Sequence, residues 1–564
     1  MSQNIWEKTR EEIIGRDSYI QTPFGRRVLT YADYTASGRG VYFIENYLIQ
    51  QLKLYGNTHT SDDATGKFTT QRLHQAEKKI KKFLNAGEEY KIISVGNGTT
   101  GAIHRLQQIL GVYVPPAAWK RFNNLFEDYL KPNEFSSFQK FMGQKRPVVF
   151  VGPYEHHSNE VTWRECFAEV VEVNLDKKGF LDLKDLEEKL SSPAYEGREK
   201  IGAFSAASNV TGLKTPVYEV AKILHRHGAL AFFDFAACAP YVSIDVHKDE
   251  ESYLDGVYFS PHKFLGGPGS SGILVIHEKI YPNTLPPTCG GGGTVKFVTP
   301  LDQEYLSDIE MREKPGTPGI LQLMKASLAM ELKEVLGVDR IEKKEAEFIQ
   351  RVFNHFKEKK EVHIIGPQDP SQRIPIFSFN LKVDSCFLHP RFVVRLLNDL
   401  FGIQARAGCS CAGPYGQKLL GISREKAEEL RDLVAMGKEG LRPGWVRVNF
   451  HYLLGEEEFE YILQSIDFLA EKGKYFLPWY RFNMETGEWI HKKEPGDEVN
   501  FGMEEALERE KGELCGRKEE SREQSYKKYM DEAEKKAKEL EKTFCEEKFK
   551  VEGRKFIPFI HYET

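Results

Sequence analysis

One lysine lies where its position and its neighbours favour chemistry over simple solubility. Lys263 follows the short strand-like run 255–259, and the glycine-rich stretch 266–269 comes directly after it. Glycines allow other groups to approach the backbone closely, and a lysine amine whose pKa is lowered by its surroundings acts as a Schiff-base nucleophile. Pyridoxal phosphate (PLP) is the cofactor most often held in this way. Considered alone, the same position also fits an ordinary surface lysine.

Two further segments could complete such a site. Asp234 ends the apolar run 230–233, and a carboxylate there could pair with the protonated pyridine nitrogen of PLP. The same residue could instead cap a following helix. The segment 96–101, Gly-Asn-Gly-Thr-Thr-Gly, lies between a predicted strand and a predicted helix. Backbone N–H groups and hydroxyls at such a helix start are suited to binding phosphate.

The segments that must position these residues alternate between strand and helix patterns. Between about residues 71 and 276, short β-rich runs alternate with helical patterns, which is typical of a parallel sheet flanked by helices. We therefore predict an α/β fold with a mostly parallel, doubly wound sheet. The predicted strands are 91–95, 148–152, 169–173, 201–206, 230–234, 257–260 and 273–276, and the predicted helices include 71–84, 183–190 and 217–227.

A smaller domain is predicted after this one. A helical pattern that begins at Gln322 leads out of the first domain, and a second alternation of strands and helices includes residues 373–381, 390–400 and 445–450. The predicted division is an N-terminal segment packing on the small domain and the site (1–60), a large cofactor-binding domain (61–335), a smaller α+β C-terminal domain (336–470), and a charged helical C-terminal extension (471–564).

Two segments have unusual composition. Residues 113–147 form an insertion rich in aromatic residues, which is expected to pack on another surface or to serve as a lid. Between residues 503 and 550, acidic and basic residues nearly balance, which favours a solvated helix with ion pairs. A narrow apolar stripe predicts that this helix lies on its own protein or on a symmetry mate, although a dedicated partner-recognition helix is the alternative. The stripe consists of Tyr526, Tyr529, Met530, Ala533, Ala537, Leu540 and Phe544.

The composition excludes several classes of protein. Of 564 residues, 40% are hydrophobic, which is enough for a sizeable core and argues against wholesale disorder. The net charge of −5 gives no field that would attract nucleic acid or an anionic membrane, and no run approaches the roughly 20 apolar residues of a membrane span. Eight cysteines are too sparse for a disulfide framework. We expect a cytoplasmic protein with reduced thiols and with neither a nucleic acid nor a membrane as partner.

Taken together, residues 31–469 resemble the class V aminotransferase family of fold-type I PLP enzymes, in particular its cysteine desulfurase and selenocysteine lyase branch. The resemblance implies that PLP is the cofactor, that Lys263 forms the Schiff base with it, and that Asp234 holds the pyridine nitrogen. The positions that match the family's phosphate-binding residues are Thr99, Thr100, Ser260 and His262.

Four further motifs take their meaning from the same resemblance. His156, in Glu155-His156-His157, matches the histidine that stacks on the cofactor ring. Asn209, in the segment 208–212, matches the asparagine near the cofactor oxygen and the substrate carboxylate. Arg447 matches the arginine that grips this carboxylate, although a surface arginine on a strand is the alternative. Thr317 matches the residue that reaches the phosphate from the partner subunit, so the resemblance implies a homodimer.

A cysteine loop would carry the sulfur chemistry. The segment 406–414 is similar to the family's mobile loop, and Cys411 matches the cysteine that attacks the substrate sulfur. Cys409 could then be a resolving or structural thiol. The two cysteines could instead be an incidental pair, a redox couple or part of a metal site, but without a nearby histidine they are weak metal ligands, and no metal is expected.

One departure from the family pattern keeps other reactions open. Desulfurases of this kind usually carry glutamine three residues after the strand aspartate, where the chain has Ala237. The expected function is conversion of free L-cysteine to L-alanine with a persulfide on Cys411, followed by transfer to a sulfur-acceptor protein. Alternatives that keep PLP are an amino-acid epimerase, an aminotransferase and a β-lyase. A non-catalytic adaptor with a charged helical tail is a third hypothesis.

Overall fold

The computed structural model describes the chain except for residues 1, 59, 495–500, 504–506, 508–520 and 563–564. Cys515 therefore lies outside the described residues. The chain divides into two compact units. We call residues 37–208 and 213–342 the central unit, and residues 1–36, 209–212 and 343–564 the terminal unit.

The central unit is built on one seven-stranded sheet with the order β4-β10-β9-β8-β7-β5-β6. The strands are β4 (Tyr90–Val95), β5 (Val148–Val151), β6 (Glu169–Glu172), β7 (Lys200–Ser205), β8 (Leu230–Asp234), β9 (Gly256–Phe259) and β10 (Gly272–His277). All seven strands expected from the sequence are therefore confirmed. The five from β6 to β9 are parallel, whereas β10 runs antiparallel to both β9 and β4. A parallel return from β9 would need a helical crossover, and the connection contains only the short turn η4 (Pro261–Lys263).

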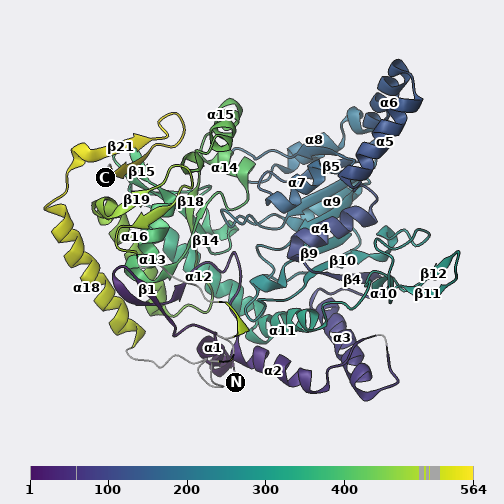
Figure 1. Ribbon diagram of the computed structural model, residues 1–564, viewed down its shortest axis with the longest axis horizontal. Helices are drawn as coiled ribbons and strands as arrows, with labels where there is room; N and C mark the ends of the chain where they lie inside the picture. Colours follow the sequence, from purple (N-terminus) through teal and green to yellow (C-terminus); the bar gives the residue numbers. More distant parts are fainter. Residues whose placement is uncertain (1, 59, 495–500, 504–506, 508–520, 563–564) are drawn as a thin grey trace. The chain divides into compact units, whose positions relative to one another are not determined.

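Helices surround this sheet, some of them packed against other helices (Figure 1). They include α2 (Tyr42–Gln51), α3 (Ala64–Phe83), α4 (Gly98–Ile109), α7 (Val161–Arg164), α8 (Leu183–Leu190), α9 (Val217–Arg226), α10 (Ile309–Arg312) and α11 (Ile320–Leu336). The helix α4 shows why such segments fold here, because Ala102, Ile103 and Leu106 recur at helical spacing and are fully buried. A small hairpin, β11 (Val295–Val298) and β12 (Gln303–Tyr305), completes the unit.

The insertion forms two helices, α5 (Pro116–Tyr129) and α6 (Pro132–Lys145), which project from the rest of the central unit (Figure 1). The rings of Phe126 and Phe138 meet at 5.0 Å between the two helices, and Trp119 lies 5.7 Å from Phe167. Leu125 and Tyr129 remain 63% and 86% exposed. The insertion thus packs mainly on itself, and its role as a lid stays a prediction.

The terminal unit contains a second mixed sheet with the path β17-β18-β14-β15-β22-β21, to which β13 adds beside β14. Its strands are β13 (Val362–Ile364), β14 (Ile376–Val383), β15 (Cys386–Leu388), β17 (Arg406–Gly408), β18 (Trp445–Asn449), β21 (Phe549–Glu552) and β22 (Phe559–Tyr562). Its helices include α1 (Ser2–Glu11), α12 (Val338–Phe356), which begins in the central unit, α13 (Pro390–Phe401), α14 (Gly413–Leu419), α15 (Arg424–Ala435) and α16 (Glu456–Lys472).

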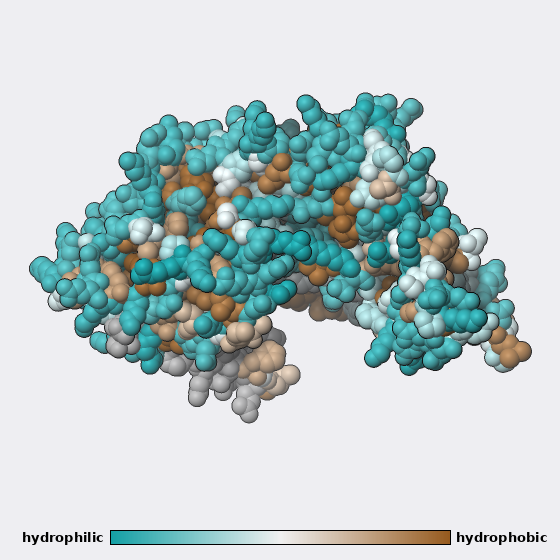
Figure 2. All heavy atoms as spheres, turned by 90° about the horizontal axis from the view of Figure 1, so that it is seen from above, coloured by the Kyte–Doolittle hydropathy of each residue, from teal (hydrophilic) through white to brown (hydrophobic). Residues whose placement is uncertain are grey.

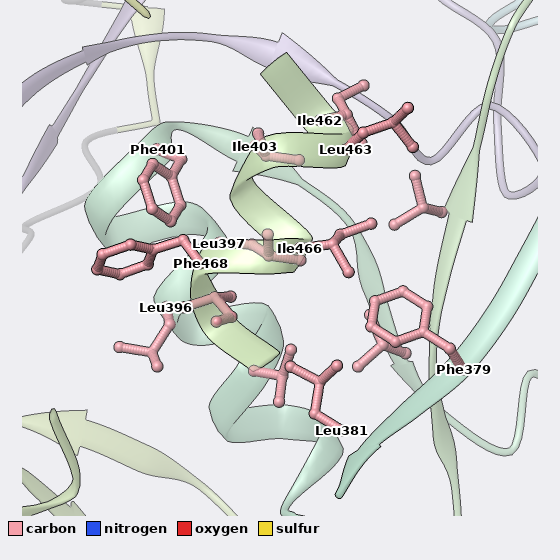
Figure 3. Close-up of a cluster of buried hydrophobic side chains, with 14 of the residues drawn as sticks. Phe379, Leu381, Leu396, Leu397, Phe401, Ile403, Ile462, Leu463, Ile466 and Phe468 are labelled. Carbon is pink, nitrogen blue, oxygen red and sulfur yellow. The ribbon is translucent and has the colours of Figure 1, made fainter. Parts of the chain in front are cut away.

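The core of the terminal unit lies between α13, α16 and the sheet (Figure 3). Leu397 and Phe401 of α13 pack with Ile462 and Ile466 of α16, and Phe379 of β14 joins them. All of these side chains are almost completely buried. Two short pairs lie beside this core: β1 (Tyr19–Thr22) with β2 (Gly25–Val28), and β3 (Thr30–Tyr31) with β16 (Ile403–Gln404).

The tail belongs to the same unit. The apolar stripe predicted for it lies on α18 (Arg522–Glu541) except for Phe544, which follows the end of the helix. Tyr526, Tyr529 and Ala537 enter the core cluster, so packing on its own protein is confirmed. The extension, predicted to be helical, also contains strands, because β19 (Tyr480–Phe482) pairs with β20 (Trp489–His491) and β22 pairs with β15. These strands are only three or four residues long, so their pattern is too short to separate them from loops.

Polar residues predominate on the face drawn in Figure 2, with scattered apolar patches, as the charged share of 29% suggests. Among the described helices, none combines the length and the apolar character that crossing a bilayer requires.

Candidate active site

The turn that carries Lys263 is held by close backbone contacts within the central unit. The N–H of Gly38 donates to the carbonyl of His262 at 2.9 Å. A Cβ atom on Gly38 would lie 2.0 Å from the carbonyl oxygen of Phe264, and one on Gly267 would lie 1.9 Å from that of Pro261. Since both obstacles are backbone atoms, only glycine fits at these positions. Gly38 and Gly267 thus fix the path of the chain around the lysine.

Asp234 ends β8, next to the strand that leads to Lys263. Strands β8 and β9 are parallel neighbours with Asp234 opposite Tyr258, five residues before the lysine. The Oδ1 atom of Asp234 accepts a hydrogen bond from the N–H of Ala236 at 2.8 Å. Burial raises the pKa of Asp234 to about 6, although this N–H group and the charge of Lys263 oppose the rise. No helix begins in the described segment 235–255, so the helix-cap alternative is wrong.

Hydroxyl groups gather at the start of α4. The Oγ of Ser260 accepts from the N–H of Thr99 at 2.8 Å and shares a hydrogen bond of 2.8 Å with its hydroxyl. Thr100 shares a hydrogen bond of 2.7 Å with the hydroxyl of Ser158. Gly98, with φ of 57°, lets the chain pass Ser260 closely. A helix start with two threonines and two serines fits a phosphate group.

His262 lies beside the start of α4, since its Cδ2 atom is 3.8 Å from where a Cβ on Gly98 would stand, whereas Thr317 lies on an exposed segment. The Nδ1 atom of His262 lies 3.3 Å from the hydroxyl of Ser37. Burial and, second, the charge of Lys263 lower the pKa of His262 to about 4, so the imidazole is neutral at pH 7. Thr317 is exposed and forms a hydrogen bond with the side chain of Asn57 at 3.1 Å.

His156 is held by its own turn, and the residue before it is one that sequence reasoning missed. Its Nδ1 accepts from the N–H of Ser158 at 3.1 Å and caps the turn η2 (His157–Asn159). Glu155 is buried and accepts from Ser205 Oγ at 2.5 Å and from Asn159 Nδ2 at 2.7 Å. Burial raises the pKa of Glu155 to about 8 despite these bonds. Glu155 thereby joins the ends of β5 and β7 to the histidine turn, and its position beside His156 was the available signal.

Within the terminal unit, Arg447 on β18 is almost completely buried. Its Nη1 donates to the backbone carbonyl of Asn209 at 3.0 Å, so two of the predicted substrate residues are brought together. Its Nη2 donates to the carboxylate of Asp33 at 2.9 Å. Burial lowers the pKa of Arg447, whereas the charge of Asp33 opposes the change. The burial excludes the surface-arginine alternative. Sequence reasoning missed Asp33, which stands in Ala32-Asp33-Tyr34 without a neighbouring motif.

The cysteine loop is a tight turn between β17 and α14. Ser410 and Cys411 have φ values of 52° and 55°, a left-handed conformation that costs energy in residues other than glycine. The side chain of Asn209 donates to the carbonyl of Ser410 at 2.6 Å and holds the turn. Cys411 is exposed and Cys409 is half-buried, and both are free thiols. In the part of the chain that the structure describes, no group of three or more metal-ligating side chains occurs.

Comparison with known proteins gives a consistent result. A family model described as aminotransferase class-V matches residues 136–458. A probable cysteine desulfurase of Halalkalibacterium halodurans is 30% identical over 391 residues, which are 68% of this chain and 84% of that protein. A probable cysteine desulfurase of Pyrococcus abyssi is 26% identical over 424 residues, or 74% of this chain and 88% of that protein.

Solved structures agree in fold. An apo cysteine desulfurase from Thermococcus onnurineus superposes with a TM-score of 0.62 at 24% identity and covers 82% of this chain and 98% of its own. The cysteine desulfurase CsdA from Escherichia coli gives a TM-score of 0.55 at 21% identity and covers 80% of this chain and 97% of its own. At these identities the structural likeness establishes the fold, which is the one expected from the sequence.

Proposed function

Because the chain belongs to the class-V aminotransferase family, we propose that it is a PLP-dependent cysteine desulfurase, which converts L-cysteine to L-alanine and takes the sulfur onto Cys411. The observation that carries the proposal is the pair Asp234 and Lys263. Asp234 ends β8, Lys263 follows the neighbouring parallel strand β9, and the charge of the lysine acts on the buried carboxylate. Such an arrangement suits a ring held between a carboxylate and an amine.

The residues of the central unit fit this cofactor. When bound, PLP supplies an electron sink that stabilises negative charge at the substrate Cα. Lys263 would hold it covalently, Asp234 would hold the protonated ring nitrogen, and His156 would cover the ring face. Burial disfavours the ionised form of Asp234, so a cationic partner in contact with it would restore the carboxylate. The phosphate would be held by Ser260, Thr99, Thr100 and the neutral His262.

The chain's own side chains then divide the work on the substrate. Arg447 would bind the substrate carboxylate through its buried guanidinium, with Asn209 beside it. The Lys263 amine would take the Cα proton and return a proton to the substrate. The Cys411 thiolate would attack the substrate sulfur, so that a sulfur–sulfur bond forms and the Cβ–S bond breaks. The electron pair of the broken bond stays on the substrate carbon, which takes up a proton and leaves as alanine.

The surroundings of Cys411 support its role as the nucleophile. It is exposed at the tip of a turn, where an acceptor thiol could reach it. It follows β17, the strand that pairs with β18, and Arg447 lies on β18. We also propose a homodimer, in which Thr317 serves the phosphate site of the partner subunit, and a sulfur-acceptor protein that receives the persulfide sulfur.

Ala237 favours a second candidate, another class-V reaction on a free amino acid. Its side chain is buried and cannot donate a hydrogen bond to a cofactor oxygen. The amide of Asn209 already uses one of its two Nδ2 N–H groups on the carbonyl of Ser410. An epimerase, aminotransferase or β-lyase would keep Lys263 and Asp234 but would not need the thiol of Cys411.

The test is to supply purified protein, loaded with PLP, with L-cysteine and a reductant. Sulfide and alanine should appear in equal amounts, and alkylation followed by mass spectrometry should find the persulfide on Cys411. Cys411→Ser should reduce sulfide release at least about a thousandfold, while the matched Cys409→Ser keeps most of the activity. Undiminished sulfide release by Cys411→Ser would remove the persulfide step and favour the second candidate.

A further inference from the structure

Two arginines face each other across the antiparallel strands β17 and β18 of the terminal unit. Arg406 and Arg447 are direct partners in the register of this pair. Like charges in directly opposed positions destabilise a sheet unless something neutralises them. The carboxylate of Asp33 does so, because its Oδ2 accepts from Arg406 Nε at 2.9 Å and its Oδ1 from Arg447 Nη2 at 2.9 Å. The two guanidinium groups and the one carboxylate together have a net charge of +1.

The backbone next to Asp33 is tied to both arginine-bearing segments. The N–H of Ala32 donates to the carbonyl of Gln404 at 3.0 Å, two residues before Arg406. The carbonyl of Ala32 accepts from the N–H of Asn449 at 2.8 Å, two residues after Arg447. The carboxylate is therefore delivered from a fixed main chain, and its side chain is only 10% exposed. A side chain fixed in this way determines where the two guanidinium groups lie.

Arg447 has N–H donors that its two hydrogen bonds to the protein do not use. Of its five N–H groups, one on Nη1 is directed to Asn209 and one on Nη2 to Asp33. Its Nε is buried and has no hydrogen-bond partner among the described residues. One substrate carboxylate would use these donors and balance the surplus positive charge. A second negative charge on the substrate would find no counter-charge in this cluster, and an unbalanced charge is costly where a guanidinium is buried.

We propose that Asp33 is a positioning and specificity residue of the carboxylate site. It orients Arg447 and offsets the repulsion between the Arg447 and Arg406 guanidinium groups. By setting the net charge of the cluster, it limits the site to amino acids that carry a single negative charge. This inference rests on the proposed role of Arg447 as the carboxylate receptor. Asp33 touches neither the reacting sulfur nor the cofactor in this account, and it acts through the two arginines.

The test uses two isosteric amino acids, L-asparagine and L-aspartate, as competitive ligands of the PLP-loaded protein. Both carry the α-carboxylate, so a change in the orientation of Arg447 affects them equally, and only the side-chain charge differs. Their dissociation constants are measured by calorimetry, which does not depend on turnover. The wild type should prefer L-asparagine. Asp33→Asn leaves both arginines unbalanced and should shift the ratio of the two constants toward L-aspartate by about tenfold or more.

Charge variants separate this role from a structural one. Asp33→Glu keeps the charge and should keep the wild-type ratio. Combining Asp33→Asn with Arg406→Gln restores the net charge of +1 and should restore the wild-type ratio of the two dissociation constants. Arg406→Gln alone removes the surplus and should move the ratio about tenfold in the opposite direction, which gives a test even where Asp33→Asn folds poorly. The matched control is Asp467→Asn, since Asp467 likewise accepts from two basic side chains, His355 and Lys359.

For L-cysteine, Asp33→Asn should raise KM about tenfold or more while kcat changes less than about threefold, because a binding group has lost its orientation. Equal ratios in wild type, Asp33→Asn and Arg406→Gln would overturn the proposal. A wild type that binds both ligands but releases no sulfide from L-cysteine would refute the proposed function alone. In that case the ratios would still decide the role of Asp33.

Discussion

The tail helix should stabilise the terminal unit through one buried charge pair. Arg522, at the start of α18, donates from Nη2 to Oε1 of Glu458 on α16 at 2.9 Å, and both side chains are about 10% exposed or less. The same guanidinium donates to the backbone carbonyls of Arg16 and Leu29. It therefore connects the tail to the N-terminal segment that leads to Asp33. We predict that Arg522→Met destabilises this unit strongly.

The magnitude follows from the burial of Glu458. Burial raises the pKa of this carboxyl, but the charges of Arg522 and Arg16, with the N–H of Gly455, outweigh burial and hold the pKa below its ordinary value. Removing Arg522 takes away the largest of these opposing effects and leaves a buried carboxylate poorly paired. The cost of such a loss is about 3–5 kcal/mol. For a unit of this size, the expected fall in Tm is roughly 6–20 °C at pH 7.5.

The stabilisation by the pair of Arg522 and Glu458 should depend on pH in a characteristic way. In the wild type the folded pKa of Glu458 is lowered, so the pair stabilises the fold above the unfolded pKa of about 4.3 and is lost as the pH falls through the folded value. In Arg522→Met the pKa of the buried carboxyl rises, and protonation relieves the unpaired charge. The difference in Tm between the two proteins should therefore be largest near pH 7.5 and should shrink toward pH 5.

Differential scanning fluorimetry from pH 5 to 8 measures this difference. Adding Glu458→Gln to Arg522→Met should recover about half of the loss or more, because the poorly paired carboxylate is then removed. The control is Lys472→Met, which breaks the more exposed pair with Glu534 between the same two helices and should cost less than about 1 kcal/mol. A Tm difference that is constant with pH, or as small as that of the control, would refute the reasoning.

Two other predictions concern the central unit. Gly38→Ala should lower stability by about 3 kcal/mol or more and reduce the PLP content of the purified protein, because its Cβ would overlap the backbone of Phe264; Gly143→Ala, where nothing lies within 4 Å, should be neutral or slightly stabilising. His262→Asn should weaken the acid sensitivity of the protein without PLP. The folded imidazole has a pKa of about 4 against the ordinary 6.5, so its contribution to stability is complete above pH 6.5 and falls as the pH drops toward 4. Thermal unfolding between pH 4.5 and 7.5 measures this effect, and a variant with an unchanged pH profile would contradict it.

The sequence predicted the central unit well because its signals are local. Most of the seven strands contain a short apolar run, and Asp234 and Lys263 both come shortly after such runs. Parallel strands end at a common edge, so chemistry-bearing residues at strand ends are brought near each other by the topology alone. The apolar face of α18 could also be predicted from the sequence, since its apolar residues recur at helical spacing.

What the sequence left undecided depends on contacts between distant segments. The pairing of β22 with β15, the insertion of α18 into the core, and the position of Glu155 join residues far apart in the chain or lack a repeated pattern. Asp33 is the clearest case. A lone aspartate near the N-terminus carries no signal of its own, and its neighbourhood exists only because Ala32 is bonded to segments that follow more than 370 residues later.

From residue types and spacing alone came the alternating fold and the lysine with its carboxylate, because side-chain chemistry and hydrophobic periodicity are properties of the local chain. The role of Cys411 came from the resemblance to the family. Tertiary structure alone decided the electrostatics: that Arg447 is buried and shared with Asp33, and that Arg406 stands opposite it. Charge interactions depend on distance and burial in space, and neither is encoded by position along the chain.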